Sequence, residues 1–193
     1  MKHTEKLARL VRIITVPPFM ILLLTITVSM QCDGVFLSIS DVCATVFFLG
    51  IIPFLAYPMQ RWIPAYKGKG REGQRELAFL CTIAGYFCAW GYGLLTKVSG
   101  ELQFIYNAYL LSVLILFVIN KGLHIRASGH ACGTIAPAVF TTYFLNIGCS
   151  AIYLLLAIAS MWASVYLKRH KLSDTVWGVL VFLCAYFIAL LYL

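Results

Sequence analysis

Two histidines and a carboxylate lie at the edges of apolar runs in the second half of the chain. The stretch "KRHKLSD" places His170 four residues before Asp174, and "ASGHA" places His130 at the start of an earlier run. We expect His170 to precede a helix whose first turn contains Asp174, and a carboxylate there can accept the imidazole N–H. Such a bond fixes the tautomer and leaves the other ring nitrogen as a nucleophile or base. His130 is the candidate proton donor to a leaving oxygen.

The same gaps carry groups suited to binding a phosphate. A helix that opens at "SGH" aims its unpaired amides and the positive end of its dipole at the gap. Basic side chains add charge-assisted donors, and a phosphate has several oxygens to accept them. Taken singly these residues are ordinary topology signals or helix-terminal groups, but together they favour a phosphate site. The candidate phosphate-binding residues are Lys121, Arg126, Ser128, Gly129, Arg169, Arg71 and Arg75.

Membrane spans must position these groups. Of 193 residues, 62% are hydrophobic and 11% are charged, whereas soluble domains have about a quarter charged. The composition predicts an all-α fold, a polytopic transmembrane helical bundle of six to seven spans that forms a single integral membrane domain over residues 1–193. The apolar runs approach the ~20 residues that cross a bilayer. They cover about 11–30, 36–57, 78–96, 103–120, 131–146, 148–167 and 174–193.

Two of these spans need an argument. Residues 131–167 are continuously apolar, but one helix of that length would be about 55 Å long, nearly twice the hydrocarbon thickness. We therefore expect a hairpin that turns at "NIGCS", where Asn146 and Gly148 supply turn residues. The N-terminal run resembles a signal sequence, but it is long for one and no small-residue cleavage site follows, so we expect a retained span.

The basic residues predict an orientation. If the gaps alternate sides, 14 of the 15 Lys and Arg fall on one side, and Lys97 alone falls opposite. By the positive-inside rule that side, with the histidines, is cytoplasmic. Part of it is a basic loop, 58–77. Its Gly and Lys content is typical of a flexible connector over anionic headgroups. Alternatively, Arg71 and Arg75, one helical turn apart, point back at a ligand.

Other partners are not expected. The formal charge of +8 lies in short gaps between apolar runs, without a basic patch interleaved with stacking aromatics, so no nucleic-acid partner is predicted. The seven cysteines form no C-x-x-C pair and fit buried apolar packing, so no metal or other cofactor is predicted. The expected partners are the bilayer and a lipid phosphate or diphosphate, and the oligomeric state is left open.

Residues 121–180 resemble a known family. "ASGHA" and "SVYLKRHKLSD" are similar to the second and third motifs, P-S-G-H and S-R-x5-H-x3-D, of the type 2 phosphatidic acid phosphatase superfamily. The resemblance implies a metal-independent membrane phosphatase that hydrolyses a lipid phosphate or (iso)prenyl diphosphate. His170 would form a phospho-histidine, oriented by Asp174. His130 would protonate the leaving alcohol and later activate water, while Ser128 and Gly129 would bind phosphate oxygens.

The sequence also departs from that pattern. Ser164 stands where the third motif has arginine, Ala163 where it has serine, and Ala127 where the second motif has proline. The first motif, K-x6-R-P, is absent as such, and Lys121 and Arg126 are approximate stand-ins. Serine cannot reproduce the planar fork of a guanidinium. We therefore expect another arginine to replace it, from Arg126, Arg169, or Arg71 and Arg75.

Two alternatives remain open at this point. A degenerate relative would bind or translocate a phospholipid without hydrolysis, which the missing motif arginine favours. A site with different chemistry would ionise or transfer a prenyl diphosphate. The presence of His170, Asp174 and His130 favours hydrolysis. Family members that act on envelope lipids generally face outward, whereas a cytosolic site suits lipid precursors made inside the cell.

Overall fold

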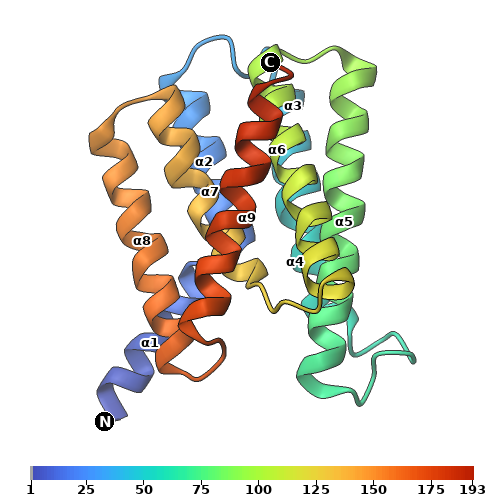
Figure 1. The fold of residues 1–193 in the computed structure, drawn as a ribbon. Coiled ribbons are helices and arrows are strands. Elements are labelled where there is room, and N and C mark those ends of the chain that lie inside the picture. The colour runs from blue at the N-terminus through green and yellow to red at the C-terminus, as the bar shows by residue number, and fades with distance from the viewer. Residues whose placement is uncertain (1) are drawn as a thin grey trace.

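Every regular element of the described chain is a helix. The computed structural model describes residues 2–193, and Figure 1 shows the arrangement of its helices. The prediction of an all-α fold is confirmed. The elements are α1 (Lys2–Ile14), α2 (Pro17–Gln31), α3 (Ile39–Thr45), the π-helix η1 (Val46–Ile51), α4 (Ile52–Met59), α5 (Gly70–Thr96), α6 (Gly100–Phe117), the π-helix η2 (Val118–Gly122), α7 (Gly129–Phe144), α8 (Ile147–Tyr166) and α9 (Leu172–Leu190).

Several of these helices are long and apolar enough to cross a membrane. Within residues 2–193 there are 5 such segments, and up to 6 if α1 and α2 count as one bent span. The five are 39–59, 70–96, 100–122, 147–166 and 172–190. The structure therefore supports a polytopic membrane bundle, with fewer full-length spans than the sequence predicts. The expected span 131–146 corresponds to α7, whose 16 residues reach only about 24 Å, less than the hydrocarbon thickness.

Successive long segments run in alternate directions, so the basic gaps meet at one end of the bundle (Figure 1). We call this the basic end. It holds α1, the 60–69 loop, the 123–128 loop and the 167–171 loop. The turns at 32–38, 97–99 and 145–146 lie at the opposite end, together with the C-terminus, and Lys97 is there.

The first predicted span, 11–30, is divided between two helices. The chain bends by 56° between α1 and α2. Val16 is extended, with φ of −61° and ψ of 141°, and Pro17 opens α2 at its first position. Proline has no N–H to continue the ladder, and it disfavours helical geometry in the preceding residue. The bend turns the basic, amphipathic α1 away from the axis of α2.

The flexible loop predicted at 58–77 is wrong over its second half. Helix α5 begins at Gly70, so Arg71 and Arg75 belong to its first two turns. Only 60–69 joins α4 to α5 without a regular helix. The glycines suggested a flexible connector, but Arg and Glu, both good helix formers, follow them. Arg71 and Arg75 thus sit on a rigid element that reaches the basic end.

The predicted hairpin within 131–167 is confirmed. Helix α7 ends at Phe144 and α8 begins at Ile147. Asn146 caps α8, with its side-chain oxygen accepting a hydrogen bond from the Cys149 amide at 3.0 Å. This turn returns α8 antiparallel to α7.

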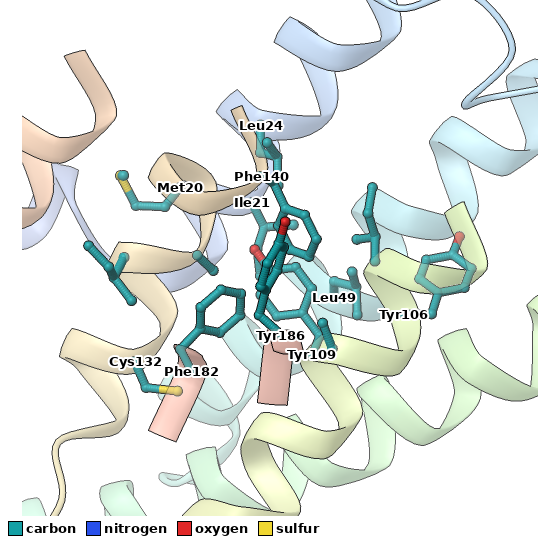
Figure 2. Close-up of a cluster of buried hydrophobic side chains, with 14 of the residues drawn as sticks. Met20, Ile21, Leu24, Leu49, Tyr106, Tyr109, Cys132, Phe140, Phe182 and Tyr186 are labelled. Carbon is teal, nitrogen blue, oxygen red and sulfur yellow. The ribbon is translucent and has the colours of Figure 1, made fainter. Parts of the chain in front are cut away.

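Buried aromatic side chains join α6, α7 and α9. The Phe140 ring centroid lies 5.6 Å from that of Phe104, 5.8 Å from that of Phe182 and 5.9 Å from that of Tyr186. Figure 2 shows Phe140, Phe182, Tyr186 and Tyr109 gathered in one cluster. Aromatic pairs at such separations add stability beyond the area they bury. This core fixes the helices whose ends carry the candidate residues.

Helix α9 approaches the start of α7 closely at Gly178. A Cβ on Gly178 would overlap the Ser128 carbonyl oxygen, and it would lie 3.1 Å from Ala131 Cβ and 3.2 Å from the Cys132 nitrogen. A hydrogen bond from the Ser128 amide to the Asp174 carbonyl, 2.8 Å long, joins the same two elements. Glycine is therefore required for the first turn of α9 to lie against the first turn of α7.

Gly178→Ala should push these two helix ends apart. We expect the free energy of unfolding in mixed micelles to fall by about 1–3 kcal/mol, the usual cost of overpacking. Gly91→Ala is the matched control, because a Cβ there meets nothing within 4 Å. That control should be neutral or stabilising, since alanine favours a helix over glycine. Equal stabilities of the two variants would contradict the close approach.

Candidate functional site

The first turn of α7 contributes backbone hydrogen-bond donors to the candidate site. Ser128 is the N-cap of the helix, and its buried hydroxyl accepts a hydrogen bond from the Ala131 amide at 3.3 Å. The amides of Gly129 and His130 open the first turn, where a helix has no partner of its own for them. Within residues 2–193 nothing else accepts a hydrogen bond from these two amides. They are donors available to an anion.

His170 and Asp174 form the pair that their spacing predicts. His170 Nδ1 lies 3.3 Å from Asp174 Oδ2, and the two side chains are only 9% and 6% exposed. The same oxygen accepts a hydrogen bond from the Lys171 amide at 3.1 Å, which caps α9. A carboxylate partner keeps the imidazole proton on Nδ1 and leaves Nε2 with a free lone pair.

His130 is hydrogen-bonded to a series of hydroxyl groups that the sequence did not predict. Its Nε2 lies 2.9 Å from Ser160 Oγ on α8. Thr15, at the bend between α1 and α2, donates to the same oxygen at 2.9 Å. Both hydroxyl groups are fully buried. This chain ties the imidazole of His130 to a fixed position and joins it to the N-terminal bend.

Ser164, at the position where the resemblance expects arginine, contacts an arginine from another helix. Arg12 of α1 donates from a terminal guanidinium nitrogen to Ser164 Oγ at 2.7 Å. Ser164 is buried and donates in turn to the Ser160 carbonyl at 2.9 Å. Arg12 was not among the candidate residues. No sequence spacing points to this contact, because Arg12 and Ser164 lie on separate helices.

The basic residues predicted to bind phosphate differ in how close they lie to the two histidines and Asp174. Arg126 is 56% exposed, with Nε 3.5 Å from Asp174 Oδ2. Arg169 precedes His170 in the 167–171 loop. Arg71 and Arg75 project from α5, and Arg12 lies within electrostatic range of Arg71, Arg75 and Arg169. Lys121 is exposed at the end of η2, and no contact within residues 2–193 ties its side chain to the histidines.

Asn120 holds the 123–128 loop against the bundle, and sequence reasoning missed it. Its side-chain oxygen accepts a hydrogen bond from the Ala127 amide at 2.9 Å. Its amide nitrogen donates to the Leu116 carbonyl at 2.9 Å and the Ala127 carbonyl at 3.3 Å. The loop that leads into Ser128 is thereby fixed. An asparagine at the end of an apolar run gives no sequence signal for such a role.

The electrostatics of the site favour a neutral His170. Burial lowers the pKa of His170 below its ordinary value, the hydrogen bond with Asp174 raises it, and the charges of Arg75 and Arg12 lower it again. A neutral imidazole is the form that can act as a nucleophile. Burial also lowers the pKa of Arg169, with the charges of Arg71 and Arg9 acting in the same direction. The positive charges of Arg75 and Arg12 near the free lone pair of His170 suit an anionic electrophile.

A titration of the imidazole by NMR in micelles should report these neighbours. His170 should titrate below 6.5, its ordinary pKa. Arg75→Gln removes a nearby positive charge and should move the midpoint upward, whereas Asp174→Asn removes the stabilising partner and should move it downward. Lys97→Gln, at the opposite end, is the control and should change nothing. A downward shift or no shift in Arg75→Gln would contradict the arrangement.

Comparison with known proteins assigns no family or function to this site. No protein-family model, curated protein or solved structure matches the chain. Within residues 2–193 no group of three or more His, Cys, Asp or Glu side chains is arranged to hold a metal ion. The chemistry of the site therefore has to be argued from its own residues.

Proposed function

We propose that this protein is a membrane phosphatase that hydrolyses a lipid phosphate or an (iso)prenyl diphosphate through a phospho-histidine intermediate. The observation that carries the proposal is the His170–Asp174 pair, 3.3 Å apart and nearly buried, beside the open amides of α7. The second histidine and the surrounding arginines support it. The resemblance of the two sequence motifs points to the same chemistry.

In the first step His170 Nε2 attacks the terminal phosphorus, and the bond from that phosphorus to the leaving oxygen breaks. The leaving oxygen is the lipid alcohol oxygen in a monophosphate and the bridging oxygen in a diphosphate. Asp174 holds the Nδ1 proton and stabilises the positive charge that the ring acquires. His130 donates a proton to the departing oxygen. A phosphate bound beside His130 brings a negative charge close to the ring, and such a charge favours the imidazolium that a proton donor must be.

In the second step water attacks the phospho-histidine. His130, now neutral, accepts the proton of that water, and the P–N bond breaks to release inorganic phosphate. The amides of Gly129 and His130 are aimed at the charge that develops on the phosphoryl oxygens. His170 returns to its neutral form. Neither step needs a metal ion.

The chief alternative is a relative that binds or translocates a phospholipid without hydrolysing it. Ser164 favours this alternative, because the α8 position lacks a guanidinium. A third possibility is ionisation or transfer of a prenyl diphosphate at the same site. The first alternative predicts no product and the second a changed lipid product, so one assay separates them from hydrolysis.

We expect the purified protein to release phosphate from at least one prenyl or acyl lipid phosphate in the presence of EDTA. His170→Ala should lower the rate by more than about 1,000-fold, as removal of a nucleophile does. Lys168→Ala, two residues away and exposed, is the matched control and should stay near wild type. Saturable lipid binding without any release would favour the binder, and a changed lipid product without free phosphate would favour transfer.

We also propose that the basic end faces the cytoplasm and that the chain crosses the membrane seven times, with α2, the 39–59 segment, α5, α6, α7, α8 and α9 as crossings. Arginine and lysine at that end support the orientation through the positive-inside rule. The alternating directions of these segments support the count (Figure 1). An odd number of crossings leaves the C-terminus on the side opposite the site.

Accessibility labelling tests this orientation. In a background without the native cysteines, Lys67→Cys in the 60–69 loop should resist a membrane-impermeant thiol reagent in intact cells and react after lysis. Lys97→Cys, exposed at the opposite end, is the matched control and should react in intact cells. The reverse pattern would mean that the site faces outward.

A further inference from the structure

Arg12 is a partly buried cation without a carboxylate partner. Within residues 2–193 no Asp or Glu forms an ion pair with it, and its one hydrogen bond goes to a neutral hydroxyl, Ser164 Oγ, at 2.7 Å. Its neighbours Arg169, Arg75 and Arg71 carry the same charge. A guanidinium drawn out of water is normally paired, because burial of an isolated charge is costly. The charge that would balance Arg12 is therefore an anion from outside the chain.

The position of Arg12 identifies where that anion would lie. Ser164 shares one face of α8 with Ser160, four residues earlier, and Ser160 contacts His130 at 2.9 Å. The charge of Arg12 also acts on both His130 and His170. The guanidinium thus lies beside the two histidines. An anion that met it would be within their reach.

The remaining contacts of α1 fix the helix at this point. Thr15 donates to Ser160 at 2.9 Å, and Ala8 is fully buried. In contrast Leu7, Leu10, Ile13 and Ile14 are each at least half exposed. Basic residues alternate with these apolar ones, the pattern of a helix that lies in a membrane interface. Its apolar side chains suit the headgroup boundary while Arg12 turns inward to α8.

We infer that α1 is an active-site element and that Arg12 supplies the guanidinium that binds the substrate phosphate. A guanidinium offers two parallel donors to phosphate oxygens, which neither Ser164 nor a lysine can replace. The inference rests on the proposed function for its substrate, and it adds the residue and the helix that complete the site. Ser164 holds the unloaded guanidinium in place until the phosphate arrives.

The test compares arginines one turn apart on the same helix. Arg12→Gln should lower phosphate release by about 100- to 1,000-fold, the cost of losing one donor aimed at developing charge. It should also weaken inhibition by orthovanadate at least tenfold. Arg9→Gln is the matched control, since Arg9 is exposed and pairs with Glu5, and both readouts should stay within a few-fold of wild type.

A double variant separates loss of binding from loss of folding. Arg12→Ala combined with Ser164→Arg moves the guanidinium from α1 to α8 and leaves no hydrogen-bonding side chain at position 12. It should recover release at least tenfold over Arg12→Ala alone, which a purely structural role of Arg12 in joining α1 to α8 would not allow. Arg12→Lys keeps the positive charge without the two parallel N–H donors of a guanidinium, and it should release less phosphate than the double variant.

The outcomes distinguish the two proposals. Full release and unchanged vanadate inhibition in Arg12→Gln, with activity lost in His170→Ala, overturn the role of Arg12 and leave the proposed function in place. If wild type releases no phosphate from any substrate, the proposed function fails. In that case, binding of orthovanadate, measured from the NMR shifts of the two histidines, tests the role of Arg12. Binding that is lost in Arg12→Gln and kept in Arg9→Gln supports the inference, and equal binding overturns it.

Discussion

The contact between the first turn of α9 and the first turn of α7 organises the basic end. Asp174 stands at its centre. Its carbonyl accepts the Ser128 amide at 2.8 Å, and its carboxylate caps α9 through the Lys171 amide at 3.1 Å. The same carboxylate faces His170. One residue thus joins the helix that offers open amides to the imidazole proposed to attack, and Gly178 gives the two backbones room to meet. This single contact therefore sets the distance between the first amides of α7 and the His170 imidazole.

The sequence predicted the local parts of this arrangement because they depend on local spacing. His170 lies two residues before α9 and Asp174 lies in its first turn, so the short approach to the helix is enough to bring the two side chains together. The "SGH" tripeptide marks a helix start through its serine cap, and "NIGCS" marks a hairpin through its asparagine. Apolar run length gave the bounds of most of the helices to within a few residues, except for the first span and the start of α5. These features need no knowledge of how the helices pack.

Features that depend on packing were missed or wrong. Arg12 reaches Ser164 across 152 positions of sequence, and no spacing rule predicts such a pair. The helical start of α5 was hidden by glycines that precede it. Arg71 and Arg75 were nevertheless placed at the right end, since alternation of the spans was enough to do that.

The contact of α1 with α8 also has a consequence for how the protein is made. Arg12 and Thr15 are synthesised among the first residues, whereas Ser160, Ser164, His170 and Asp174 come near the end. Contacts so distant in sequence form late, because the whole intervening chain has to be inserted and packed first. A nascent chain that stops before α8 has no docking place for α1 and lacks His170, the proposed nucleophile. The candidate site is complete only in the finished molecule, so a chain whose synthesis ends early lacks the contacts that join α1 to α8.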